Sequence, residues 1–384
     1  MSSNEPSIDE EVNDEEVSGT GDAKDNSQSG SDSESRSNDE SSSNTDIENQ
    51  EKSPLHCAVE EGNIEMVKEL LKIGCNPNVT NEKKASALFI AFINGNMQII
   101  NLLLQYGANI GEALIWAIKD ENADVFKKIL EFGVNSNKVE HNQSYGTHIM
   151  LAIERENLQI VQLLLQYGAD PNYIDIIGKS PIHEAVIFNY IEITKELLKH
   201  GAEVDRESII EMTPLMHALY EKMFEIAKIC LEHGANINHQ CSKDGRTALH
   251  VASNTGKLET IEFLLKHGAN IDAIDDENCT PLHLAARKEF PWTENDSLLR
   301  EQPEAVKILL KNGANPNLQD MHSKTGLYYA VRGRNFQIIR LYLEYATNLD
   351  LSIRDKDGKT VFEYALSWKN VYFVKMMAFH QNTV

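Results

Sequence analysis

Residues 247–279 read TALHVASNTGKLETIEFLLKHGANIDAIDDENC, and Thr280 starts a second copy, TPLHLAARK. The stretch predicts two short helices joined by a tight turn. Thr247 suits the N-cap of the first helix, where its hydroxyl can accept a hydrogen bond from a first-turn N–H. Gly256 interrupts the pattern and predicts the end of that helix.

The second helix of the unit is indicated by apolar spacing. Ile261, Leu264 and Leu265 fall on one face of a helix that starts near Leu258. Gly268 then stands where the end of a helix needs a left-handed residue. The polar, turn-rich residues 270–278 predict an extended loop that leads to the next N-cap.

The same unit recurs along the chain, which predicts an all-α fold. One copy cannot bury its own apolar face, whereas stacked copies can, so a period near 33 residues indicates a solenoid. Ten copies start near residues 53, 86, 112, 147, 180, 213, 247, 280, 325 and 360. The third start follows the second by only 26 residues, so the loop before it is missing. The eighth copy carries an insertion, 288–304, which we expect to form a loop between its two helices.

The motifs TPLHLAA (280–286) and GANIDAID (268–275), with the Leu-Leu run before them, resemble the ankyrin repeat. The resemblance covers residues 53–384 and implies an ankyrin-type α-solenoid of stacked helix–turn–helix repeats with finger turns. It also implies that the fingers and first helices line a concave face that binds a partner protein. The function implied is a non-enzymatic protein–protein interaction scaffold or adaptor.

Residues 1–52 differ in composition from the repeats. They contain 16 Asp or Glu and 3 Lys or Arg, out of a net charge of −23 for 384 residues. Such a segment cannot bury enough apolar surface to offset its ordering entropy, so we expect a disordered acidic tail. The tail is either a solvated, solubilising segment or a phosphorylated one. Acid-directed kinase sites are suggested by four serines: Ser29, Ser31, Ser37 and Ser43.

A second function remains open on this basis, a phosphorylation-controlled inhibitor of a transcription factor. QSGSDS (28–33) partly resembles the D-S-G-x-x-S phosphodegron of inhibitors of Rel-type transcription factors, but Gln28 stands in place of the first aspartate. A third alternative of another class is an enzyme, or an effector secreted into a host cell.

Charge and hydropathy argue against several partner classes. The acidic balance is unlike the basic surface that nucleic-acid binding needs. No apolar run approaches the 18 residues of a membrane span, and no signal pattern opens the chain. The five cysteines include no C-x-x-C pair, although Cys241 and Cys279 lie in neighbouring loops. We therefore expect free thiols, a cytoplasmic or nuclear location, and a monomer that binds neither nucleic acid nor membrane.

Histidine recurs at the fourth position of the T-P-L-H motif, in His56, His183, His250 and His283. Equivalent residues of neighbouring repeats should lie roughly 10 Å apart, the packing distance of helices. That separation is too large for one zinc ion, so we expect structural hydrogen bonds to the neighbouring turn. No nucleophile–base pair is specified, and we expect no catalytic residue, no cofactor and no metal.

The candidate binding residues are those that follow the first-helix alanine, which the resemblance places on the concave face. They are acidic in the first repeats (Glu60, Glu61), aromatic in the fifth and sixth, and basic in the eighth and ninth. Binding energy concentrates in a few aromatic and arginine side chains. We therefore predict that Phe188, Tyr190 and Tyr220 form a hot spot and that Arg287, Arg332 and Arg334 engage acidic groups. Trp292, in the insertion, could add an exposed hook.

Overall fold

The computed structural model describes residues 53–137, 147–175, 178–287 and 298–366. The chain divides into two units, Met1–Gln50 and Glu51–Val384, and every described residue belongs to the second. The described residues form nineteen helices and no strand, in agreement with the all-α prediction. None of those helices is long and apolar enough to cross a membrane.

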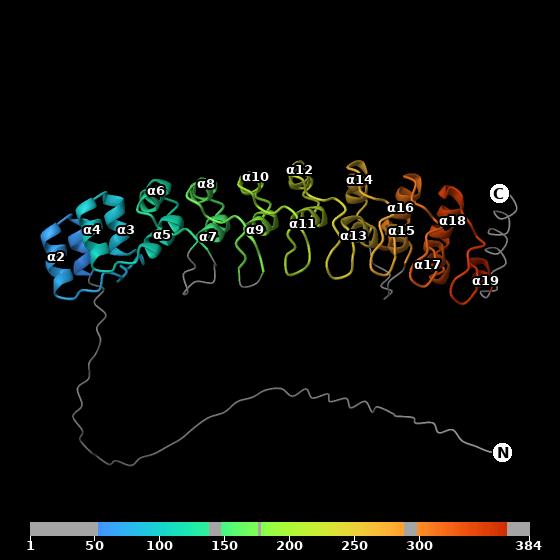
Figure 1. Ribbon diagram of the computed structural model, residues 1–384, viewed down its shortest axis with the longest axis horizontal. Helices are drawn as coiled ribbons and strands as arrows, with labels where there is room; N and C mark the ends of the chain where they lie inside the picture. Colours follow the sequence, from blue (N-terminus) through green and yellow to red (C-terminus); the bar gives the residue numbers. More distant parts are fainter. Residues whose placement is uncertain (1–52, 138–146, 176–177, 288–297, 367–384) are drawn as a thin grey trace, which may run out of the picture. The chain divides into compact units, whose positions relative to one another are not determined.

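The helices alternate between a short first helix and a second helix in each repeat (Figure 1). The first helices are α1 (Pro54–Glu60), α3 (Ala87–Asn94), α5 (Ile110–Lys119), α7 (His148–Glu154), α9 (Pro181–Ile187), α11 (Pro214–Tyr220), α13 (Ala248–Thr255), α15 (Pro281–Ala286), α17 (Gly326–Arg332) and α19 (Val361–Leu366). The second helices are α2 (Ile64–Lys72), α4 (Met97–Gln105), α6 (Ala123–Glu131), α8 (Leu158–Gln166), α10 (Ile191–Lys199), α12 (Phe224–Glu232), α14 (Leu258–Lys266), α16 (Leu298–Lys311) and α18 (Phe336–Tyr345).

The helix ends follow local sequence rules. Thr247 and Thr280 start capping boxes, in which the histidine three residues later reaches back to the N-cap backbone. Several second helices begin instead at an asparagine; the Asn96 side chain accepts from the N–H of Ile99 at 3.2 Å. Gly268 has a φ of +86°, as expected of a residue in the left-handed region after a helix.

The repeats are held together by contacts between neighbours along the chain. Each first helix packs against the next, as α1 does on α3 and α3 on α5, and most neighbouring second helices do likewise, as α2 does on α4. Figure 1 shows the second helices on one side of the first helices and the loops between repeats on the other. Ile261 and Leu264 are fully buried, and Leu265 packs against the core from a partly buried position. The spacing in the sequence therefore identified the packed face.

The loops between repeats are the fingers of the fold, and several of those that the structure describes are closed by a polar side chain of the finger itself. In the finger before α15, the Asp275 N–H donates to the Cys279 carbonyl at 3.0 Å. The Cys279 N–H donates in return to Asp275 Oδ1 at 2.8 Å. Asp275 is buried, so these bonds satisfy a carboxylate that would otherwise be costly to bury.

A second set of polar contacts links the base of one finger to the next repeat. In each link, an asparagine or aspartate side chain accepts from a backbone N–H of the following repeat. The accepting residues are Asn78, Asn137, Asn172, Asp205, Asn238, Asp272 and Asn317. We refer to this set as the finger-base links. They fix the register of neighbouring repeats at the bases of the fingers, away from the packed helices.

Two repeats depart from the common pattern. Helix α5 begins at Ile110, two residues before the expected start at Glu112, because the Asn109 side chain caps it by accepting from Gly111 N at 3.0 Å. Only four residues separate α4 from α5, so no finger stands between the second and third repeats. In the eighth repeat, α16 already begins at Leu298 and contains Pro303. Residues 298–304 of the expected loop insertion are therefore helical, and 288–297 lie outside the described residues.

Candidate functional site

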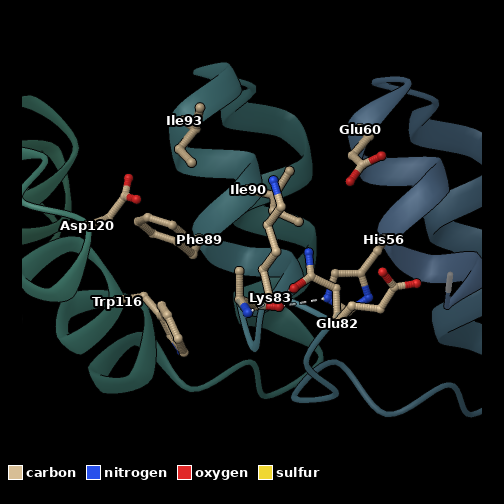
Figure 2. Close-up of a pocket in the computed structure, with 11 residues that line it drawn as sticks. His56, Glu60, Glu82, Lys83, Phe89, Ile90, Ile93, Trp116 and Asp120 are labelled. Carbon is tan, nitrogen blue, oxygen red and sulfur yellow. Dashed lines mark hydrogen bonds between the residues drawn. The ribbon is translucent and has the colours of Figure 1, made fainter. Parts of the chain in front are cut away.

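The first three repeats enclose a pocket of about 330 Å³ on the side of the first helices and fingers. Figure 2 shows side chains from α1, α3, α5 and the finger before α3 converging on it. Its apolar lining comes from α3 and α5: Phe89, Ile90, Ile93 and Trp116. Its polar lining comes from α1, the finger and the end of α5: His56, Glu60, Asn81, Glu82, Lys83 and Asp120.

The pocket lies where the finger between the second and third repeats is missing. In four other repeats, a histidine of the first helix donates to a carbonyl in the finger that follows it. The four bonds are His56 Nε2 to Ala85 O (3.0 Å), His183 to Arg206 O (3.0 Å), His250 to Cys279 O (2.9 Å) and His283 to Lys324 O (3.1 Å). The second repeat has Phe89 at this position and no following finger. Phe89 lines the pocket at this position.

Carboxylates surround the apolar part of the pocket. Glu60 on α1, Glu82 on the finger and Asp120 after α5 are exposed at its rim, and Lys83 supplies an ammonium group. Lys119 adds a cation beside the pocket, with its Nζ 5.3 Å from the centre of the Trp116 ring. Burial lowers the pKa of His56, so its imidazole is neutral and adds no charge to the pocket, and its one N–H is donated to the Ala85 carbonyl.

The aromatic residues predicted as a hot spot fall in two places. The rings of Phe188 and Tyr190 stack with centroids 5.5 Å apart and an interplanar angle of 21°. Phe188 is 45% exposed, and Tyr190 packs partly against the core as the N-cap residue of α10. Tyr220, at the end of α11, does not contact this pair. Its ring packs instead against Lys257, whose Nζ lies 3.4 Å from the ring centre.

The predicted arginines lie at the ends of the first helices of the eighth and ninth repeats. The Arg287 guanidinium lies 5.5 Å from the centre of the Tyr329 ring and 3.5 Å from Glu277 Oε2, so it is already engaged within the protein. Arg332 and Arg334 are exposed near the end of α17. Trp292 lies outside the described residues.

The histidines and cysteines have structural surroundings. The described bonds confirm that the T-P-L-H histidines hydrogen-bond to neighbouring turns. None of the five cysteines, all within the described residues, forms a disulfide, and burial raises the pKa of Cys241 to about 11 and of Cys279 to about 12. Across the described parts of the repeats, no three His, Cys, Asp or Glu side chains are grouped to hold a metal ion.

Sequence reasoning did not single out the pocket of the first three repeats. Glu60 was among the residues expected on the binding face, whereas Phe89 and Trp116 were not among them. The signal was present in two separate observations, the missing finger before the third repeat and the replacement of histidine by Phe89. Joining them requires knowing that the histidine bonds forward to the next finger, which only the structure shows.

Comparison with known proteins supports the repeat assignment. The model for ankyrin repeats in three copies matches residues 38–113, 114–208, 149–241, 215–293 and 297–383. A putative ankyrin repeat protein of fowlpox virus, FPV223, is 30% identical over 139 residues, which are 36% of this chain and 87% of the viral protein.

Other relatives are longer proteins that share only part of their length with this chain. Human transient receptor potential cation channel subfamily A member 1 is 28% identical over 124 residues, 32% of this chain and 10% of the channel. Human B-cell lymphoma 3 protein is 28% identical over 134 residues, 33% of this chain and 27% of that protein.

Two solved ankyrin-repeat structures are similar to the chain at low identity. The ankyrin repeat domain of Bcl-3 aligns with a TM-score of 0.48 and 22% identity, covering 75% of this chain and 96% of that one. EF0377, an ankyrin repeat protein, aligns with a TM-score of 0.45 and 26% identity, covering 51% and 96%. The family model spans most of the sequence, and the chain belongs to the ankyrin-repeat family.

Proposed function

We propose that this protein is a non-enzymatic scaffold that binds a partner protein on the surface formed by its first helices and fingers. Ankyrin repeats are generally protein-interaction modules. Protein partners fit the proposal better than small substrates, because the apolar residues exposed on this surface are spread over several repeats. They include Ile93, Phe188 and Tyr220, each between 40% and 45% exposed.

The Phe188–Tyr190 stack is the observation that carries the proposal. Phe188 is the C-cap residue of α9 and Tyr190 the N-cap residue of α10, so both ends of the pair are attached to helices. The Phe188 and Tyr190 side chains therefore lose little conformational entropy when a partner binds to them. Partly exposed aromatic side chains on a rigid support are typical of interface hot spots.

The experiment compares partner capture by matched aromatic variants of the full chain. Partners captured from a cell extract are identified by mass spectrometry, and their affinities are then measured for Phe188→Ala and Tyr220→Ala. Tyr167→Ala serves as the control, because Tyr167 is 41% exposed but caps the second helix α8 rather than a first helix. We expect the first two variants to weaken binding at least tenfold, equivalent to about 1.4 kcal/mol, and the control to leave it unchanged.

Equal affinities for all four proteins, with the folds intact, would contradict the assignment of this surface. The partner set also bears on the phosphorylation-controlled inhibitor, which depends on residues 1–52. A transcription factor that is captured only before phosphorylation of the tail would favour the inhibitor. Partners captured equally by the chain with and without residues 1–52 would favour the adaptor. Light scattering at the concentrations used for binding would test the expected monomer.

A further inference from the structure

We propose that the pocket of the first three repeats anchors one basic side chain, arginine or lysine, from an exposed segment of a partner protein. The inference rests on the proposed function in one respect, that the occupant belongs to a protein partner. The pocket lies among α1, α3 and α5, whereas Phe188 lies at the end of α9, so the two sites can be tested separately.

The pocket suits the apolar stem of a long side chain. Phe89, Ile90 and Trp116 line it, and Ile93 is 45% exposed at its edge. Lysine and arginine bury their methylene stems against apolar surface while the charged head stays near polar groups. A volume of about 330 Å³ lies at the lower end of the range for drug-sized ligands, which fits a single side chain better than a folded element.

The rim selects the charge of the occupant. Figure 2 shows Glu60 and Asp120 on opposite sides of the apolar residues, with Glu82 on the finger between α2 and α3. The three carboxylates come from separate elements and outnumber the one ammonium group of the lining, that of Lys83, so the balance of charge favours a cation. Lys119 already lies near the Trp116 ring, so selection for a positive charge comes from the carboxylates rather than from the ring.

The same charges argue against two other occupants. The tail of this chain, residues 1–52, carries 16 acidic and 3 basic residues, and its net negative charge is repelled by the rim. A phosphate backbone is repelled for the same reason. A basic segment of another protein is the occupant that the surrounding charges attract.

Trp116 makes occupancy directly measurable in the full chain. The protein contains three tryptophans, and labelling with 5-fluorotryptophan gives each a fluorine resonance; Trp116→Phe assigns the one in the pocket. The probes are acetylated, amidated peptides of sequence Gly-Leu-X-Leu-Gly in which X is arginine, lysine, citrulline, norleucine or glutamate. We expect the arginine and lysine peptides to shift the Trp116 resonance in a saturable way. The citrulline, norleucine and glutamate peptides should bind at least fivefold more weakly.

Charge removal at the rim is tested with a matched pair of double variants. Glu60→Gln with Asp120→Asn removes two rim carboxylates, and Glu61→Gln with Glu121→Gln removes two exposed carboxylates next to them that do not line the pocket. At about 0.15 M salt, where screening acts over about 8 Å, the first pair should weaken the arginine peptide about fivefold or more and the second pair by less than about twofold. Ile93→Arg places a cation of the chain itself at the pocket edge and should block the peptide.

The proposal is overturned if peptides of every charge bind equally, if none shifts the Trp116 resonance, or if both double variants weaken binding alike. Failure of the proposed function gives a different pattern. In that case Phe188→Ala and Tyr220→Ala change no captured partner, while the arginine peptide still binds the pocket. Thermal melting of each variant by circular dichroism verifies that the fold is retained.

Discussion

His250 donates from Nε2 to the carbonyl oxygen of Cys279, the residue just before the N-cap of the next repeat, at 2.9 Å. Its Nδ1 accepts from the N–H of Thr247 at 3.1 Å. The two bonds require the neutral imidazole, with a proton on Nε2 and none on Nδ1. One side chain thus joins the start of its own helix to the finger that follows. A second proton would go on Nδ1 and would break the bond from the Thr247 N–H.

The free energy of unfolding should therefore fall as the solution is acidified below about pH 6.5. Burial lowers the pKa of five imidazoles, those of His56, His183, His217, His250 and His283. The unfolded chain takes up these protons near pH 6.5 and the folded chain only at lower pH. Each imidazole contributes a loss of up to about 1.4 kcal/mol per pH unit between its two pKa values.

Urea unfolding between pH 7.5 and 5.5, followed by circular dichroism, measures this dependence. His250→Gln should make the profile shallower, whereas the same change at His322, which is exposed, should leave its slope unchanged. Equal stability at both ends of the range would contradict the buried neutral state of these histidines.

Leu264→Ala should lower the free energy of unfolding by about 2–5 kcal/mol, from lost burial and the cavity that remains. Leu264 is fully buried on the packed face of α14. Glu262→Ala, in the same helix but exposed, should change stability by less than about 0.5 kcal/mol. Denaturant titration of both variants measures the two changes in stability. Equal changes would mean that the packed face of this helix is assigned to the wrong residues.

Asn172→Ala should lower the free energy of unfolding by about 1–2 kcal/mol, since it removes two hydrogen bonds between repeats. The side chain donates to the Gly201 carbonyl at 3.0 Å and accepts from the Glu203 N–H at 2.8 Å. Asn172→Asp keeps the acceptor and loses the donor, so we expect roughly half the effect. Thermal unfolding of the three proteins would rank them, and a neutral alanine variant would show that these exposed links add nothing to stability.

Deletion of residues 1–52 should strengthen binding of a partner that uses the basic end of the repeats. The acidic tail could compete for Arg332 and Arg334, which are exposed. The gain should be larger at 0.01 M salt than at 0.15 M, because the screening length falls from about 30 Å to about 8 Å. Titration calorimetry with the captured partner at both salt concentrations tests this, and identical affinities with and without the tail would remove the competition hypothesis.

The fold could be predicted from the sequence because each repeat carries the same local signals, namely helix caps, apolar spacing and turn glycines. The spacing of Ile261 and Leu264 and the position of Gly268 identified the helices and their packed face. The expectation of a loop over residues 288–304 was wrong for residues 298–304, because α16 begins at Leu298 and includes Pro303. Helix propensity indicates where an isolated helix would begin, whereas packing against neighbouring repeats can extend a helix beyond that residue.

The candidate sites were harder to predict where they join residues that are distant in the sequence. Phe188 and Tyr190 are two residues apart, and their proximity was anticipated as a cluster. Arg287 was expected to face a partner, but its position over Tyr329 depends on the next repeat. The pocket needs side chains from three repeats and the finger between the first two of them. No property of one residue or of one repeat contains that arrangement.

The histidine bonds and the finger-base links share a direction along the chain. The histidine reaches forward to the finger that follows its helix, and the finger-base side chain reaches forward to the backbone of the next repeat. Cutting the chain between two repeats therefore leaves two unlike ends. The upstream piece keeps finger-base side chains, such as that of Asn172, whose backbone partners have gone. The downstream piece loses only cover over backbone groups that water can satisfy. Shortened versions of this protein should consequently tolerate loss of repeats from the front better than from the back.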